Sequence, residues 1–269
     1  MKNVHTALMF FMITSAFCFA VNTHAADDPD LARLFRDAGV EGTMVITSLD
    51  GKETFIYNKV RSEKRFTPSS TFKIPNTLIA LQEGAVRDER EVIRWDGKDK
   101  GFDAWNRDQT LETAFPASCV WFYQELAKRV GDGKYVSWLS KLGYGNAKTG
   151  PDVTTFWLDG QLKISAGEQI EFLRRLYEER LPFKKEHMRL LKKLMIVGEN
   201  PRYTVRAKTG WAMRTNPQQG WYVGYVEAGK KVCFFAMNIE IRKKGDEKLR
   251  RQLTMEALTA KGIIAKENG

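Results

Sequence analysis

The chain has 269 residues, of which 43% are hydrophobic and 12% aromatic, and a formal net charge of +10. A chain of this size and composition can bury one large hydrophobic core or two interlocked ones. Its excess of Lys and Arg over Asp and Glu favours anionic partners, which include carboxylated small molecules as well as nucleic acids. The sequence has no basic run with interleaved aromatic residues, so nucleic-acid binding is not expected.

Residues 1–25 have the features of a secretory signal peptide that is cleaved from the mature chain. Lys2 precedes an apolar stretch over residues 7–21, and Thr23-His24-Ala25 stands before the expected cleavage point. The apolar stretch is shorter than the ~20 residues needed to span a bilayer. We therefore expect an exported, soluble protein in the periplasm that has no membrane association after cleavage.

Histidine and cysteine usage narrows the possible chemistry. His5 and His24 fall in the leader, which leaves His187, in a Lys- and Arg-rich stretch typical of a solvated helix face. A Ser-His-Asp triad would depend on that single residue, and a histidine-rich zinc site cannot be assembled, so no metal is expected. Cys119 and Cys233 are each set among apolar residues, which favours two buried free thiols over a disulfide bridge.

The predicted elements place strands at both ends of the chain. Residues 42–49 and 52–57 have strand patterns and are joined at Asp50-Gly51, a dipeptide typical of a β-hairpin. Between about 70 and 200 the patterns are mostly helical, and Ser165 with Glu168 forms a capping box. The remaining predicted elements are strands at 203–209, 220–227 and 231–239 and a closing helix at about 246–261.

This order of elements predicts an α/β (α+β) fold in which an antiparallel sheet, flanked by helices, carries an inserted all-helical lobe. We expect residues 26–66 and 203–269 to form the sheet-containing lobe and residues 67–202 to form the helical lobe, the two making one catalytic unit. An active site between the sheet and the helical lobe follows from this arrangement.

Ser70 and Lys73 are candidates for a nucleophile and its base. Two residues three apart in a helix lie on one face, so the amine can reach the hydroxyl and take its proton. Ser-x-x-Lys alone is a weak signal, because about one match is expected by chance in a chain of this size. Ile74, Leu78 and Leu81 strengthen it, since they describe a helix buried on one side with Ser70 at its N-terminus.

Lys-Thr-Gly occurs twice in the sequence. Lys148-Thr149-Gly150 directly precedes Pro151 in a Gly- and Asn-rich stretch, so a loop is expected there. Lys208-Thr209-Gly210 ends a strand pattern, and a strand edge can hold the Lys and Thr side chains in a cleft while Gly lets a substrate approach the backbone. We therefore expect the second copy to be functional and the first to be a chance match.

These motifs stand in one order with Ser118-Cys119-Val120, Tyr144-Gly145-Asn146, Trp157-Leu158 and Trp211, and the set resembles the class D (oxacillinase-type) serine β-lactamases. The resemblance covers about residues 31–264 and implies the serine β-lactamase/penicillin-binding-protein-like fold. It also implies hydrolysis of the β-lactam amide bond through a serine acyl-enzyme, and hence resistance to β-lactam antibiotics.

The resemblance assigns a role to each motif residue. Lys73 would be carboxylated by CO2 to N6-carboxylysine and act as general base, so CO2 or bicarbonate is required and no other cofactor is expected. An apolar pocket fits this role, because it lowers the pKa of an amine toward the neutral form that reacts with CO2. The other implied roles are proton relay by Ser118, positive charge from Lys208, support of the carbamate by Val120 and Trp157, an oxyanion hole from Ser70 and Trp211, and substrate binding by Tyr144, Thr209, Gly210 and Arg250.

Several alternatives stay open. Arg251 could take the place of Arg250, and Tyr144, Val120 and Trp157 could be packing residues. A penicillin-binding transpeptidase or carboxypeptidase shares two of the motifs but typically has Asn where this chain has Val120. A soluble β-lactam sensor domain would stay acylated, and a class A β-lactamase would need a separate glutamate base.

The substrate range and homodimer formation are also open. The candidates to line the region that binds the substrate side chain are Phe102, Trp105, Trp211, Met213 and residues 215–219.

Overall fold

The computed structural model describes residues 27–265, so the predicted signal peptide lies outside the described residues. Its centre is a six-stranded sheet of order β2-β1-β6-β5-β4-β3 in which all neighbouring strands are antiparallel. The α+β fold is therefore confirmed. The strands are β1 (Gly42–Ser48), β2 (Thr54–Tyr57), β3 (Ile196–Asn200), β4 (Tyr203–Ala212), β5 (Gln218–Ala228) and β6 (Lys231–Ile241).

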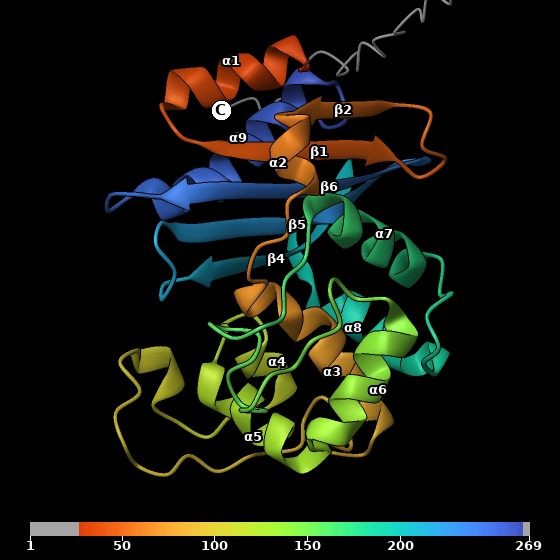
Figure 1. Ribbon diagram of the computed structural model, residues 1–269. Helices are drawn as coiled ribbons and strands as arrows, with labels where there is room; N and C mark the ends of the chain where they lie inside the picture. Colours follow the sequence, from red (N-terminus) through yellow and green to blue (C-terminus); the bar gives the residue numbers. More distant parts are fainter. Residues whose placement is uncertain (1–26, 266–269) are drawn as a thin grey trace, which may run out of the picture.

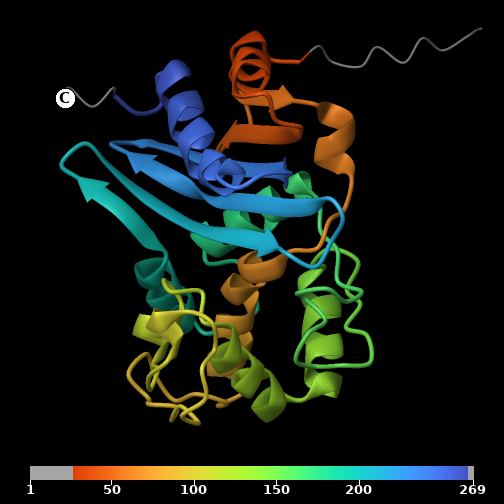
Figure 2. The same cartoon turned by 90° about the vertical axis from the view of Figure 1, so that its left-hand side faces the viewer.

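Both faces of the central strands are buried, because helices cover each side of the sheet. One face packs on α1 (Pro29–Ala38) and α9 (Asp246–Ala260), and the other on α7 (Ala166–Tyr177) (Figures 1 and 2). Strand β6 shows the alternation: Phe234 joins the core on the α7 side, whereas Phe235 joins the core under α1 and α9. This explains why β5 and β6 are apolar along almost their whole length.

A helical lobe lies beyond β4 (Figure 1). Its core is continuous with the core on the α7 face of the sheet. The segment from Phe66 to Ser69 connects the sheet-containing part of the chain to the helical lobe. Phe66 forms an antiparallel β-bridge with Ile164, and the Trp221 indole N–H donates a hydrogen bond to Thr67 O at 2.9 Å. The remaining helices are α2 (Lys59–Glu63), the 3-10 helix η1 (Ser69–Phe72), α3 (Lys73–Gln82), the 3-10 helix η2 (Asp103–Trp105), α4 (Leu111–Ala114), α5 (Val120–Val130), α6 (Asp132–Leu142) and α8 (Lys185–Leu194).

The predicted hairpin and capping box are confirmed, since β1 pairs with β2 and Ser165 caps α7 with Glu168. The range 67–202, expected to be helical, contains one strand of the sheet, β3. Its sequence is short and partly polar, and it lies at the sheet edge with Ile196 and Val197 exposed. Its pairing with β4 therefore comes from the tertiary structure and has no strong local pattern.

Two further sequence predictions can be compared with the described residues. Cys119 and Cys233 are buried free thiols, as predicted. Within residues 27–265, no helix is both long and apolar enough to cross a membrane.

Candidate active site

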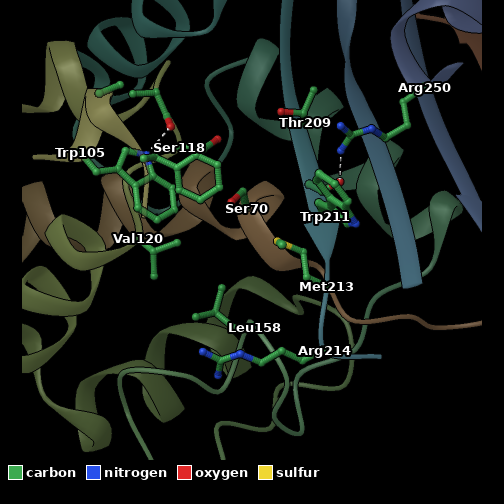
Figure 3. A pocket seen from close by; sticks show the side chains of 14 residues that line it. Ser70, Trp105, Ser118, Val120, Leu158, Thr209, Trp211, Met213, Arg214 and Arg250 are labelled. Atoms are coloured by element: carbon green, nitrogen blue, oxygen red, sulfur yellow. Dashed lines mark hydrogen bonds between the residues drawn. The ribbon is translucent and has the colours of Figure 1, made fainter. Parts of the chain in front are cut away.

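A cleft of about 530 Å³ opens between the C-terminal end of β4 and the helical lobe (Figure 3). Ser70 lies at its centre, with Ser118 and Val120 on the helical side and Trp211 on the strand side. The cleft is lined by Ser70, Phe102, Ala104, Trp105, Ala117, Ser118, Val120, Leu158, Thr209, Gly210, Trp211, Met213, Arg214 and Arg250.

The Ser70 and Lys73 side chains meet as the motif predicts. Ser70 belongs to η1 and Lys73 is the first residue of α3, and Lys73 Nζ lies 3.0 Å from Ser70 Oγ. Lys73 is fully buried, and this burial lowers its pKa from 10.5 to about 7. A substantial fraction of the amine is therefore neutral near pH 7 and can accept a proton from the serine.

A second serine and lysine pair faces the first. Lys208 on β4 donates a hydrogen bond to Ser118 Oγ, and both side chains come from segments far apart in the sequence. Burial, with the charges of Lys73 and Arg250, holds the pKa of Lys208 well below its usual value. Ser118 has a φ of 54°, a left-handed conformation that costs a serine about 1–2 kcal/mol. Such strain is typical of residues held in place for function.

Val120 lines the cleft, whereas Trp157 is buried beside the segment that carries Ser70. Val120 is the first residue of α5 and lines the cleft. Trp157 is fully buried, stacks on Phe72 with ring centroids 5.6 Å apart, and accepts a backbone hydrogen bond from Ser69 at 2.8 Å. Its indole Nε1 is buried with no acceptor among the described residues. An unpaired buried donor beside the nucleophile's segment fits an anion that is bound there during function.

Arg250 lies at the opposite end of the cleft. Its guanidinium donates to Gly210 O and lies 5.8 Å from the centre of a Trp211 ring. Burial lowers the pKa of Arg250 to about 10, so it remains charged at neutral pH. The alternative, Arg251, is exposed and lines a different surface, beside β3. Arg250 with Thr209 therefore forms the cationic and polar end of the cleft.

Gly210 is needed for the close approach of β4 to η1. A Cβ at this position would lie 2.8 Å from Pro68 O and 3.1 Å from Thr71 Cγ2. These distances are closer than carbon atoms normally allow. Gly210 therefore lets the backbone of β4 run directly beside the turn that carries Ser70.

The structure does not bring Tyr144, expected to bind substrate, to the cleft wall, because its side chain is buried in the core. Tyr144 is 1% exposed and packs against Phe72 and Phe172, with ring centroids 5.8 and 5.2 Å away. The flanking glycines, Gly143 and Gly145, both have left-handed backbones (φ 59° and 57°). This tight turn directs the tyrosine between them inward, away from the cleft.

Part of the cleft wall was not predicted. Phe102, Trp105 and Met213 line it as expected, whereas residues 215–219 do not. Leu158 and Arg214 also line it, and Arg214 forms an ion pair with Asp159 at 2.5 Å. Leu158 and Arg214 each follow a residue that the sequence predicts for the site, Trp157 and Met213, but no local sequence pattern places their own side chains in the cleft.

Two other candidates lie outside the cleft. The first Lys-Thr-Gly copy is in the segment between α6 and α7, where Lys148 is exposed. His187 lies in α8 and does not line the cleft. Residues 27–265 contain no group of three or more His, Cys, Asp or Glu side chains that could hold a metal ion.

A buried serine–lysine pair, a second such pair and an arginine, placed between an antiparallel sheet and a helical lobe, define a serine acyl-transfer site. The protein-family model of the penicillin binding protein transpeptidase domain matches residues 41–259. The chain is 41% identical to Beta-lactamase OXA-2 of Salmonella typhimurium over 256 residues, which cover 93% of this chain and 92% of that one. It is also 41% identical to Beta-lactamase OXA-48 of Klebsiella pneumoniae, over 86% of this chain and 87% of that one.

Solved structures give the same result. The fold matches the class D β-lactamase YbXI from Nostoc with a TM-score of 0.85 and 39% identity, over 87% of this chain and 99% of that one. It matches FUS-1 (OXA-85), a class D β-lactamase from Fusobacterium nucleatum, with a TM-score of 0.86 and 34% identity, over 89% and 100% of the two chains. The chain belongs to the class D serine β-lactamases.

Proposed function

We propose that this chain hydrolyses the amide bond of β-lactam antibiotics through an acyl-enzyme on Ser70. The observation that carries the proposal is the fully buried Lys73 amine, 3.0 Å from Ser70 Oγ and with its pKa lowered to about 7. A base so placed can take the serine proton as the hydroxyl attacks a carbonyl carbon.

The other cleft residues then have defined tasks. Ser70 Oγ bonds to the lactam carbonyl carbon, the C–N bond breaks, and the departing nitrogen needs a proton. The Ser118 hydroxyl, which accepts a hydrogen bond from Lys208, is placed to deliver that proton. The Ser70 and Trp211 backbone N–H groups would hold the developing oxyanion. Arg250 and Thr209 would bind the substrate carboxylate. All of these groups come from one chain, so the proposed reaction needs no residue from another subunit, whether the protein is a monomer or a homodimer.

Carboxylation of Lys73 Nζ by CO2 would supply the general base for both acylation and deacylation. Two features of the chain support this modification. The buried amine is substantially neutral near pH 7, and only a neutral amine reacts with CO2. The unpaired Trp157 Nε1 offers a buried hydrogen-bond donor to an anion.

Turnover of a chromogenic cephalosporin tests the proposed activity. We expect continuous hydrolysis by the wild type, and neither turnover nor a covalent adduct with Ser70→Ala. A stable adduct on the wild type without turnover, detected by intact-protein mass spectrometry, would instead indicate a transpeptidase or sensor. An adduct at Ser69 or Ser118 in the variant would contradict the assignment of the nucleophile.

Carbon-13 spectroscopy tests the modification separately. In labelled bicarbonate we expect a carbamate signal that Lys73→Ala removes. Protonation of the carbamate releases CO2, and the freed amine then takes up a proton and no longer reacts with CO2. Activity should therefore fade below about pH 7 in degassed buffer and return with bicarbonate at constant pH. Hydrolysis without either effect would leave the β-lactamase activity intact and refute the carboxylated base.

We also propose that the protein acts in the periplasm and confers β-lactam resistance. The support is the signal-like composition of residues 1–25 together with the family to which the chain belongs. N-terminal sequencing of protein from a periplasmic extract should begin near Ala26. A chain that begins at Met1, or that stays in the cytoplasm, would contradict this location.

A further inference from the structure

A second cavity, of about 740 Å³, borders the catalytic cleft. Trp211 lines both cavities, and its indole is fixed by a hydrogen bond from Nε1 to Gln218 Oε1 at 2.8 Å. The other wall is the turn between β6 and α9, which carries Arg242, Lys243 and Lys244. We call this cavity the outer groove.

The outer groove has an excess of positive charge. Three cationic side chains line it against one carboxylate, that of Glu247, which accepts a hydrogen bond from Gly245 N at 2.7 Å. Arg242 is paired with Glu240 at 2.8 Å. Lys243 and Lys244 are exposed, and neither forms an ion pair with any residue in 27–265. Two unpaired ammonium groups therefore face the solvent in this groove.

The turn that carries these lysines is ordered. The carboxylate of Asp246, which is 4% exposed, accepts hydrogen bonds from the backbone N–H groups of Arg242 and Lys243, both at 3.0 Å. The backbone positions of Arg242 and Lys243 are thus set before a ligand binds. This arrangement lowers the entropy that binding costs.

The outer groove is connected to the proposed carboxylate-binding end of the cleft. Arg250 Nε donates to Glu247 O at 2.6 Å, and its guanidinium lies 5.8 Å from the centre of a Trp211 ring. If a β-lactam binds with its ring carboxylate at Arg250, the substituent on the adjacent ring carbon would lie near Arg250 and Trp211, where the two cavities meet. In a cephalosporin that substituent is the C3 side chain.

We propose that the outer groove is a second anion subsite, for β-lactams whose substituent beside the ring carboxylate carries another negative group, such as a sulfonate or carboxylate. This inference rests on the proposed β-lactamase function and specifies its substrate class. Lys243 and Lys244 supply the charge. Because both are exposed, we expect an effect on specificity of about three- to tenfold.

A matched pair of cephalosporins provides the test. Both carry the same mandelamido group, and at C3 one has a methyl-tetrazolylthiomethyl and the other a sulfomethyl-tetrazolylthiomethyl substituent. The values to compare are kcat/KM, which report steps up to acylation, before the C3 group can leave. We expect Lys243→Gln/Lys244→Gln to lower the sulfonate-to-methyl ratio of kcat/KM by about three- to tenfold.

The control is a second exposed lysine pair, Lys230 and Lys231, at the opposite end of β5 and β6. Lys230→Gln/Lys231→Gln removes the same net charge and should leave the ratio unchanged. A ratio that does not respond to the groove variant, or that falls equally in the control, overturns the proposal, since the second result indicates long-range attraction alone.

Binding to Ser70→Ala separates this inference from the proposed activity. Calorimetric Kd values for the two compounds should show the same three- to tenfold change in ratio between the groove variant and its parent, and the change should shrink in high salt. A wild type that hydrolyses neither compound would contradict the proposed function. The ratio of the two Kd values, measured with Ser70→Ala, would still show whether the outer groove binds the sulfonate.

Discussion

The two Lys-Thr-Gly triplets have identical residues and opposite surroundings. Lys208 lies on β4, is 4% exposed and is bonded to Ser118, and its pKa is held well below the usual value. Lys148 lies in the segment between α6 and α7, exposed and away from the cleft. The difference shows that burial and neighbouring groups give a lysine its chemistry, and that a three-residue pattern does not.

The largest expected difference between the two triplets is the effect on kcat/KM of replacing Lys208 or Lys148 by alanine. Lys208→Ala takes away the amine that donates a hydrogen bond to Ser118 Oγ, and we expect kcat/KM for a penicillin to fall by about 10²–10⁴. Lys148→Ala should change it less than about twofold, because the side chain is exposed outside the cleft. Equal losses in two variants with matching circular dichroism spectra and Tm values would show that the difference in environment has no functional meaning.

The third lysine, Lys73, extends the comparison, because it is buried like Lys208 but faces Ser70. Val120→Asp would bring a carboxylate into the cleft, favour the ammonium form of Lys73 and disfavour its carboxylation. We expect acylation to slow and deacylation to fall by about 10²-fold, so that the acyl-enzyme accumulates. Time-resolved intact mass spectrometry measures both steps. The control Val120→Asn has no charge and should retain more deacylation than Asp; equal defects would point to packing.

The glycines of the two triplets should respond in opposite ways. Gly210→Ala places a Cβ 2.8 Å from Pro68 O, which pushes β4 away from η1, and we expect about a tenfold loss of kcat/KM. Gly150 has a φ of 90° but meets no atom closer than 3.5 Å, so Gly150→Ala should cost about 1 kcal/mol of stability without loss of activity. Urea unfolding and steady-state kinetics on both variants measure the two effects. An active Gly210→Ala enzyme would mean that the contact between β4 and η1 does not align the site.

Most of the fold could be predicted because its signals are local. Asp50-Gly51 between two strand patterns predicted the β1–β2 hairpin, and the Ser165 capping box predicted the start of α7. Strand β3 could not be predicted in this way, since its pairing with β4 depends on the tertiary structure and its residues are partly polar and exposed. The limit is physical: an edge strand has only one hydrogen-bonded neighbour and a weak hydrophobic pattern.

The candidate site divides in the same way. Ser70 and Lys73 are one helical turn apart, so their contact follows from sequence spacing. Lys208 and Ser118, by contrast, are 90 residues apart, and they could be paired only through the family resemblance. Tyr144 shows the risk of that route, because the two left-handed glycines beside it direct the ring into the core. Leu158 and Arg214 depend on loop positions that no local pattern sets.

The smallest expected effect is on the free energy of unfolding. A buried lysine such as Lys73 should lower it below pH 10.5, and an exposed lysine such as Lys148 should not. In degassed buffer the Lys73 pKa is about 7 in the folded protein and 10.5 in the reference state, so between these values the unfolded chain binds one more proton than the folded one. The unfolding free energy must then rise with pH, by up to about 1.4 kcal/mol per pH unit, and Lys73→Met should lack this contribution. Urea titrations at pH 7, 8 and 9 measure it as the difference between wild type and variant. Lys148→Met is the matched control and should keep the wild-type pH dependence. If Lys73→Met also keeps the wild-type pH dependence of the unfolding free energy, burial does not deprotonate the Lys73 amine. The contrast between buried and exposed lysines would then be wrong for the lysine beside the nucleophile.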